Sequence, residues 1–229
     1  MTKQKTAAML STLVAAAMAL PRMPSAQTQP AAMDIADAPI PMRVLEQSPA
    51  QTDTDLQVIC LFSSSPANTL HGSLVEVNEK LKGLLDRIRR ASLFRGELGE
   101  TLLLTPPRGS LGARKLLIIG LGDAETFSPA RMQLVGEIVY AEASRLGVSH
   151  PFFAPTILDG GLTKFTTGQI AEQVVRGFLR AMEIDQAIQG NAAAGHGMAL
   201  TYLAGPRYAS NTRQGMETAI SMRGEPQQH

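Results

Sequence analysis

The glycine turn Gly120-Leu121-Gly122-Asp123 is the segment whose residue types could do chemistry by holding a cofactor. It follows an apolar strand and precedes a helix, where backbone amides can cradle a phosphate. The turn has no third glycine, however, and Asp123 and Glu125 place negative charge where a phosphate would lie. The pattern favours a structural strand-to-helix turn. Under the alternative of a nucleotide site, the cofactor-binding residues would be Gly120, Gly122 and Asp123.

Other residue types that do chemistry are few or badly spaced. The four histidines never stand four residues apart, and there is no Gly-x-Ser-x-Gly nucleophile elbow. The carboxylates do not assemble into a set that would hold two metal ions. Cys60 is the only cysteine, and it lies in an apolar run where it is expected to be a core residue. We therefore predict no catalytic residue, no metal site and no cofactor.

Apolar runs bounded by turn residues predict strands, and apolar residues at helical spacing predict the helices between them. We expect six strands, at 42–46, 56–62, 100–105, 114–120, 149–157 and 198–204, and four helices, at 73–88, 128–146, 166–182 and 210–222. This alternation predicts an α/β/α fold with a mostly parallel sheet. The short turn at 106–110 allows a hairpin but no parallel crossover, so the sheet should be mixed.

Two of the helices carry the sequence pattern of a capping box. In this pattern a hydroxyl residue opens the helix, and a Glu or Gln three residues later bonds back to it. The pairs are Ser73 with Glu76 and Thr166 with Gln169. We expect both pairs to cap their helices.

The N-terminal residues have the composition of an export signal and a linker. Lys3 and Lys5 precede an apolar run of 14 residues from Ala7 to Leu20, which is too short to span a bilayer. We predict a signal peptide at 1–26, a disordered tether rich in Pro, Ala and Gln at 27–41, and one folded domain at 42–229. The expected location is the periplasm or the cell exterior.

Charge excludes a polyanionic partner. Without residues 1–26 the chain has 18 basic and 20 acidic residues, and its basic residues share their helices with acidic ones. Nucleic-acid binding needs clustered Lys and Arg, so we expect no nucleic-acid partner. We also expect no membrane span once the signal peptide is removed.

The middle of the chain resembles the N-terminal domain of the leucyl (cytosol) aminopeptidase family. The pattern Phe94-x-Gly96-x-x-Gly99-Glu100 precedes the strand end Ile118-Ile119-Gly120-Leu121-Gly122. Phe127-Ser-Pro-Ala-Arg131 then opens a helix, and a later helix at 172–185 has a central Gly177 and ends in Ile184-Asp185, where the family has an aromatic-Asp pair. The resemblance covers about residues 42 to 222.

The resemblance implies a macro-like α/β/α domain without catalysis of its own. The metal ligands of the family lie around an Asn-Thr-Asp-Ala-Glu-Gly-Arg signature in a separate catalytic domain, and this sequence contains no such signature. The resemblance therefore implies a non-catalytic module that binds a partner or regulates a peptidase, and the predicted signal peptide, which is a departure from the family, adds that the module is exported. The expected partner is a separate aminopeptidase catalytic chain or a second copy of this chain. Whether the chain has any enzymatic activity is left open.

The alternative function is small-molecule binding or weak hydrolysis of the macro-domain type, with an ADP-ribose-like nucleotide as ligand. The segment Asn191-Ala-Ala-Ala-Gly195 is similar to a loop of ADP-ribose-binding macro domains, but it follows a helix and leads into a strand. In macro domains that order is reversed. The segment therefore predicts a connection rather than a binding loop.

Overall fold

A computed structural model describes residues 30–63, 69–189 and 197–224. In chain order the elements are β1 Ala32–Asp34, β2 Met42–Leu45, β3 Leu56–Leu61, α1 Gly72–Lys80, α2 Leu84–Arg90, β4 Thr101–Leu104, β5 Lys115–Gly120, α3 Arg131–Arg145, β6 Phe152–Ala154, α4 Thr167–Gln189, β7 Leu200–Leu203, α5 Pro206–Ser221 and a short 3-10 helix at Met222–Gly224. None of the helices in these ranges is long and apolar enough to span a membrane.

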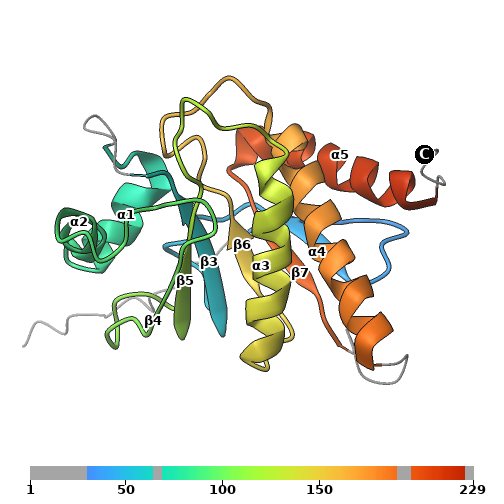
Figure 1. The fold of residues 1–229 in the computed structure, drawn as a ribbon, viewed down its shortest axis with the longest axis horizontal. Coiled ribbons are helices and arrows are strands. Elements are labelled where there is room, and N and C mark those ends of the chain that lie inside the picture. Colours follow the sequence, from blue (N-terminus) through green and yellow to red (C-terminus); the bar gives the residue numbers. More distant parts are fainter. Residues whose placement is uncertain (1–29, 64–68, 190–196, 225–229) are drawn as a thin grey trace, which may run out of the picture.

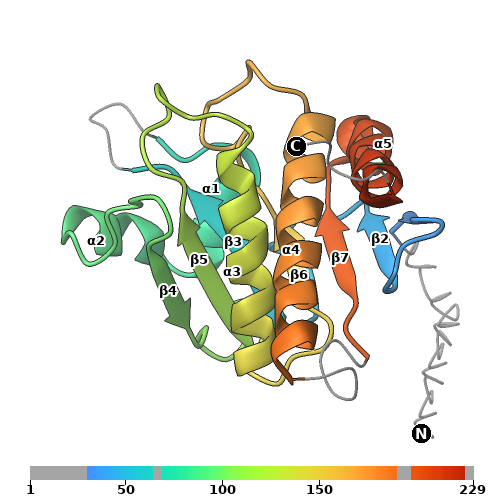
Figure 2. The ribbon, with the colours of Figure 1, turned by 45° about the vertical axis from the view of Figure 1, so that its right-hand side comes forward.

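One mixed sheet of seven strands forms the centre of the domain, in the order β1-β2-β7-β6-β3-β5-β4. The five inner strands run parallel, and β1 and β4 pair antiparallel at the two edges. The short connection between β4 and β5 forces the hairpin that the sequence predicts. Because the inner strands are parallel, their carboxyl ends meet at one edge of the sheet (Figure 2).

Helices cover both faces of the sheet, as expected for an α/β/α fold (Figure 1). On one face α3, α4 and α5 cover a large apolar core that includes Phe153, Phe178 and Tyr202. On the other face α1 and α2 cover a smaller core that includes Leu74 and Leu85. All six residues of β3 are buried, which is the pattern of a strand with helices on both sides.

The strand β1 corrects two predictions, the count of six strands and the disordered tether at 27–41. Residues 32–34, which were assigned to a disordered tether at 27–41, pair with β2 as a seventh strand. Ile35 and Ile40 are also buried, with 7% and 8% of their surface exposed. Two apolar side chains in a Pro- and Ala-rich stretch are enough to anchor a short edge strand. Residues 1–26 lie outside the described residues, as does the loop at 191–195.

The first predicted helix is two helices. Lys82 and Gly83 have φ angles of 54° and 75°, so the chain leaves the helical conformation between α1 and α2. The capping box at Thr166 and Gln169 is confirmed, since each backbone amide donates to the side chain of the other residue, at 3.0 and 3.2 Å. The capping box at Ser73 and Glu76 is wrong. Both side chains instead bond to other loops.

Candidate ligand-binding cleft

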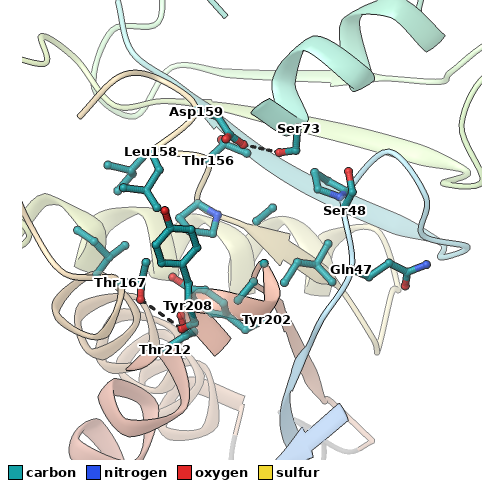
Figure 3. Close-up of a pocket in the computed structure, with 18 of the residues that line it drawn as sticks. Gln47, Ser48, Ser73, Thr156, Leu158, Asp159, Thr167, Tyr202, Tyr208 and Thr212 are labelled. Carbon is teal, nitrogen blue, oxygen red and sulfur yellow. Dashed lines mark hydrogen bonds between the residues drawn. The ribbon is translucent and has the colours of Figure 1, made fainter. Parts of the chain in front are cut away.

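A cleft of about 620 Å³ lies at the carboxyl edge of the parallel strands. Its walls are the segments that follow β2, β6 and β7 together with the first turn of α1, which follows β3. Figure 3 shows Ser73 and Asp159 at one end and Thr167 and Thr212 at the other. In open parallel sheets, ligands bind in the crevice outside the carboxyl ends of the strands. The position and size of this cleft therefore suit a small-molecule site.

The wall formed by residues 155–159 is held in place by Thr156. Its hydroxyl accepts a hydrogen bond from the Cys60 amide at 3.0 Å and donates one to the Cys60 carbonyl at 2.6 Å. The strand β6 ends at Ala154, so this side chain continues the pairing that the β6 backbone no longer supplies. Thr156 has a φ of 50°, which turns the chain away from the sheet and across the cleft.

Asp159 is the most perturbed carboxylate in the cleft. Its side chain accepts a hydrogen bond from the Ser73 hydroxyl at the start of α1. Burial raises the pKa of the Asp159 carboxyl above its ordinary value, and the charge of Glu76 adds to this rise. Hydrogen bonds from Ser73 and the charge of His71 oppose it. Ionised Asp159 is thus partly desolvated and next to a second carboxylate.

Glu76 connects α1 to a third wall of the cleft, the loop after β2. It lies one turn after Ser73 on α1, and its Oε2 accepts a hydrogen bond of 2.7 Å from the hydroxyl of Ser48. Ser48 belongs to the loop after β2, and this loop also contributes Glu46 to the cleft. The sequence patterns of Ser73 and Glu76 suggested a local cap, so their role in joining three separate segments was missed.

At the opposite end the cleft contains two buried hydroxyls without a partner. Tyr202 and Thr212 line the cleft and are each only 1% exposed. Neither Tyr202 Oη nor Thr212 Oγ1 has a hydrogen-bond partner within the described residues. The carbonyl of Tyr208, which lies four residues before Thr212 on α5, accepts a hydrogen bond from the hydroxyl of Thr167 and not from that of Thr212. Unpaired buried polar groups are costly. Both oxygens are closed to solvent in this structure, so a ligand or water would reach them only if the surrounding side chains moved.

The predicted cofactor residues lie outside this cleft: Gly120 is the last residue of β5, and Gly122 and Asp123 are on the loop that follows it. A Cβ atom at Gly120 would lie 2.0 Å from the Glu97 carbonyl oxygen, so the strand end packs directly on the neighbouring loop. Gly122 has a φ of 74° and its amide donates to the Gly96 carbonyl at 2.9 Å. Asp123 is exposed and accepts a hydrogen bond from the Glu125 amide. These contacts are those expected of a structural strand-to-helix turn.

We predict that Gly122→Ala lowers the free energy of unfolding by about 1 kcal/mol or more. Alanine is strained at a φ of 74°, and its methyl group would meet Leu98 and Arg131 at 3.3 Å. Urea unfolding of the two proteins measures the difference. A variant that keeps wild-type stability but loses a nucleotide-induced stabilisation would instead make this turn a nucleotide site.

The residues that carry the family resemblance also support the fold rather than the cleft. The Glu100 carboxylate accepts hydrogen bonds from the amides of Arg95 and Glu97, which folds the 94–100 loop on itself. Asp185 accepts a hydrogen bond of 2.8 Å from Tyr140 and so joins α4 to α3. Burial, followed by this bond and the charge of Asp185, raises the pKa of Tyr140 to about 12.

No group of three or more His, Cys, Asp and Glu residues in the described part of the chain is placed to hold a metal ion. Cys60 is fully buried, and burial raises the pKa of its thiol far above the ordinary value. A buried thiol of this kind is a poor nucleophile, because the thiolate is the reactive form. The described lining of the cleft offers hydroxyls, carboxylates and apolar surface to a ligand.

The model of the cytosol aminopeptidase family, N-terminal domain, matches residues 58–189, more than half of the sequence. The chain belongs to this family. A probable cytosol aminopeptidase of Burkholderia thailandensis is 40% identical over 62 residues, which are 27% of this chain and 12% of that protein. A homologue from Burkholderia mallei matches to the same extent. The match thus spans about an eighth of the length of these relatives.

Solved structures confirm the macro-like fold. A mutant of the Oceanobacillus iheyensis macrodomain superposes with a TM-score of 0.58 at 12% identity, and covers 84% of this chain and 99% of that one. A mutant of tomato leucine aminopeptidase superposes with a TM-score of 0.57 at 18% identity. It covers 82% of this chain and 37% of the tomato chain. At such identities these likenesses establish the fold alone.

Proposed function

We propose that this chain is a non-catalytic binding module of the cytosol aminopeptidase family and that the cleft is its ligand-binding site. The supporting observation is the cleft itself, whose four walls come from separate segments of the chain and which lies at the carboxyl edge of the parallel strands. The proposed role in a peptidase system is to sense a small molecule.

An ADP-ribose-like nucleotide is the ligand suggested by the fold. Structures of the Oceanobacillus iheyensis macrodomain include one with ADP. Among the described residues that line the cleft are Glu46, Glu76 and Asp159, and none of these lining residues is a Lys, Arg or His. A diphosphate would therefore meet negative charge, although Lys164 and Arg207 stand beside the cleft, over the rings of Phe165 and Tyr208. This charge balance makes a nucleotide the second choice.

The proposal is tested by mapping ligands on the amide spectrum of the isotopically labelled protein. A fragment library with anionic, neutral and cationic members, together with ADP-ribose, is titrated against the protein. We expect the hits to shift amides in residues 46–51, 155–159 and 204–208. Hits that consistently shift the 120–123 turn and leave the cleft unchanged would contradict the proposal.

Exposed leucines favour protein binding as a second function. Leu93, Leu98 and Leu134 are 71%, 43% and 39% exposed, and Leu98 and Leu134 both lie beside Gly99. Apolar side chains gathered on a surface often mark a protein contact. The proposed partner is an aminopeptidase catalytic chain or a second copy of this chain. The double change of Leu98 and Leu134 to Glu should abolish that association in sedimentation velocity, and association that survives it would exclude this surface.

Export remains part of the proposal. The basic start and short apolar run of residues 1–26 are typical of a signal peptide. We predict that the protein expressed in a bacterial host reaches the periplasm with its N-terminus near Gln27. Mass spectrometry of the periplasmic protein measures this directly, and an intact Met1 would overturn both the boundary and the location.

A further inference from the structure

The charged residues described in the lining of the cleft are all acidic. Three carboxylates line it, from Glu46, Glu76 and Asp159, and the described lining residues include no basic side chain. Basic groups stand near the cleft: Lys164 lies 5.0 Å from the centre of the Phe165 ring, and Arg207 lies 5.4 Å from that of Tyr208. His71, which is not a lining residue, carries a charge that opposes the rise in the pKa of Asp159. Lys80 donates to the Ala50 carbonyl. The carboxylates therefore lack an ion-pair partner within the cleft.

Asp159 and Glu76 stand close enough to repel one another. The charge of Glu76 is one of the causes that raise the pKa of Asp159, and burial of Asp159 is the larger one. Each carboxylate receives a hydrogen bond from a neutral serine hydroxyl, Ser73 for Asp159 and Ser48 for Glu76. Serine hydroxyls orient the carboxylates but do not neutralise them. A ligand cation placed between them would relieve both the repulsion and the desolvation.

A structural explanation accounts for only part of this arrangement. Asp159 contacts the first turn of α1, where a carboxylate is stabilised by the free backbone amides. Capping of α1 needs only one carboxylate, however, so it does not explain why Glu46 and Glu76 also line the cleft. It also does not explain the buried, unpaired hydroxyls of Tyr202 and Thr212 in the same cleft.

The wall between the two ends is largely apolar, formed by side chains such as Ile157, Leu158, Phe165 and Tyr208. Figure 3 shows Leu158 and Tyr208 between the Asp159 end and the Thr212 end. We propose that the cleft binds a ligand that carries a primary ammonium group on a partly apolar body, with the ammonium group at Asp159 and Glu76. This inference rests on the proposed function of the cleft and specifies the chemical class of its ligand.

The test compares three probes of one shape and different charge: phenethylamine, phenethyl alcohol and hydrocinnamate. Their dissociation constants are measured by amide shifts at about pH 7, with ADP-ribose as a fourth probe. We expect phenethylamine to bind about tenfold more tightly than the alcohol, since a hydrogen bond to a charged group adds this much. Hydrocinnamate should bind most weakly. Asp159→Asn should bring the amine to the affinity of the alcohol, and the control Asp123→Asn should leave all affinities unchanged.

Stability separates a binding effect from a folding effect. Because the pKa of Asp159 is raised in the folded state, its ionisation opposes folding as the pH rises through that pKa. Asp159→Asn should therefore melt no lower than the wild type at neutral pH while it loses the preference for the amine. The amide oxygen of asparagine can still accept the bond from Ser73.

Each outcome decides a different claim. Three results would overturn the ammonium ligand and leave the binding cleft standing. They are equal binding of amine and alcohol, tighter binding of hydrocinnamate or ADP-ribose than of the amine, and an amine preference that survives both Asp159→Asn and Glu76→Gln. Failure of all four probes to shift the cleft amides would count against the ammonium ligand and the proposed function together.

Discussion

Replacement of Gly177 by alanine should destabilise the protein on the order of 2 kcal/mol or more, although alanine is the better helix former. Gly177 lies in the middle of α4 where this helix crosses α3, and a Cβ atom there would lie 1.9 Å from the Gln133 carbonyl oxygen. Gly136 on α3 makes the reciprocal contact, 2.1 Å from the Val174 carbonyl oxygen. Backbone cannot yield as a flexible side chain would, so the helices must separate and open the core.

The sign of the effect identifies its cause. Helix propensity alone would make Gly177→Ala stabilising by about 1 kcal/mol. The matched control is Ala181→Gly, one turn later on α4, which should destabilise by about that amount because it has only the propensity effect and a small loss of burial. Urea unfolding measures both. A Gly177→Ala variant more stable than the wild type would contradict the close crossing of α3 and α4.

The second large effect is expected at Thr156. Thr156→Val keeps the shape of the side chain but removes the hydroxyl that bonds the amide and carbonyl of Cys60. Two buried backbone groups would lose their partner, at about 1–3 kcal/mol each, so the free energy of unfolding should fall by about 2–6 kcal/mol. The loop at 155–159 should also lose its anchor, and ligand shifts in the cleft should weaken with it.

Thr156→Ser is the matched control, since it keeps the hydroxyl and removes only a methyl group. We expect serine to retain most of the stability and all of the ligand shifts. Thermal and urea unfolding of both variants give the comparison. Equal stability of the valine and serine variants would show that the hydroxyl is not what holds this wall of the cleft.

Most of the fold follows from the sequence because apolar periodicity and short turns are local signals. The buried run Leu56–Leu61 predicts an inner strand, and the hairpin of β4 and β5 follows from a turn too short for a crossover. The edge strand β1 was missed because three residues have too weak a pattern to distinguish them from a tether. Its pairing with β2 depends on the finished sheet.

The cleft was harder to predict because its residues come from distant parts of the chain. Ser73 and Glu76 fit a local capping pattern, and only the fold shows that they bond to Asp159 and Ser48. The Gly120–Asp123 turn drew attention because glycines near a strand end are a familiar phosphate signal. In the structure Gly120 packs closely on the backbone of Gly96 and Glu97. Asp159 has no sequence signal beyond its place after an expected strand.

The central claim is that this cleft binds a small ligand, and the most direct test is to block it. Gly205 is exposed, has an ordinary φ of −69°, and a Cβ atom there would have only a normal contact with Tyr208. Gly205→Phe should therefore fill the mouth of the cleft without backbone strain, and Gly205→Ser is the small control. We predict that ligands found by the amide titration bind the wild type and the serine variant equally, and bind the phenylalanine variant at least about tenfold more weakly. Unchanged affinity in a folded Gly205→Phe protein would contradict the claim.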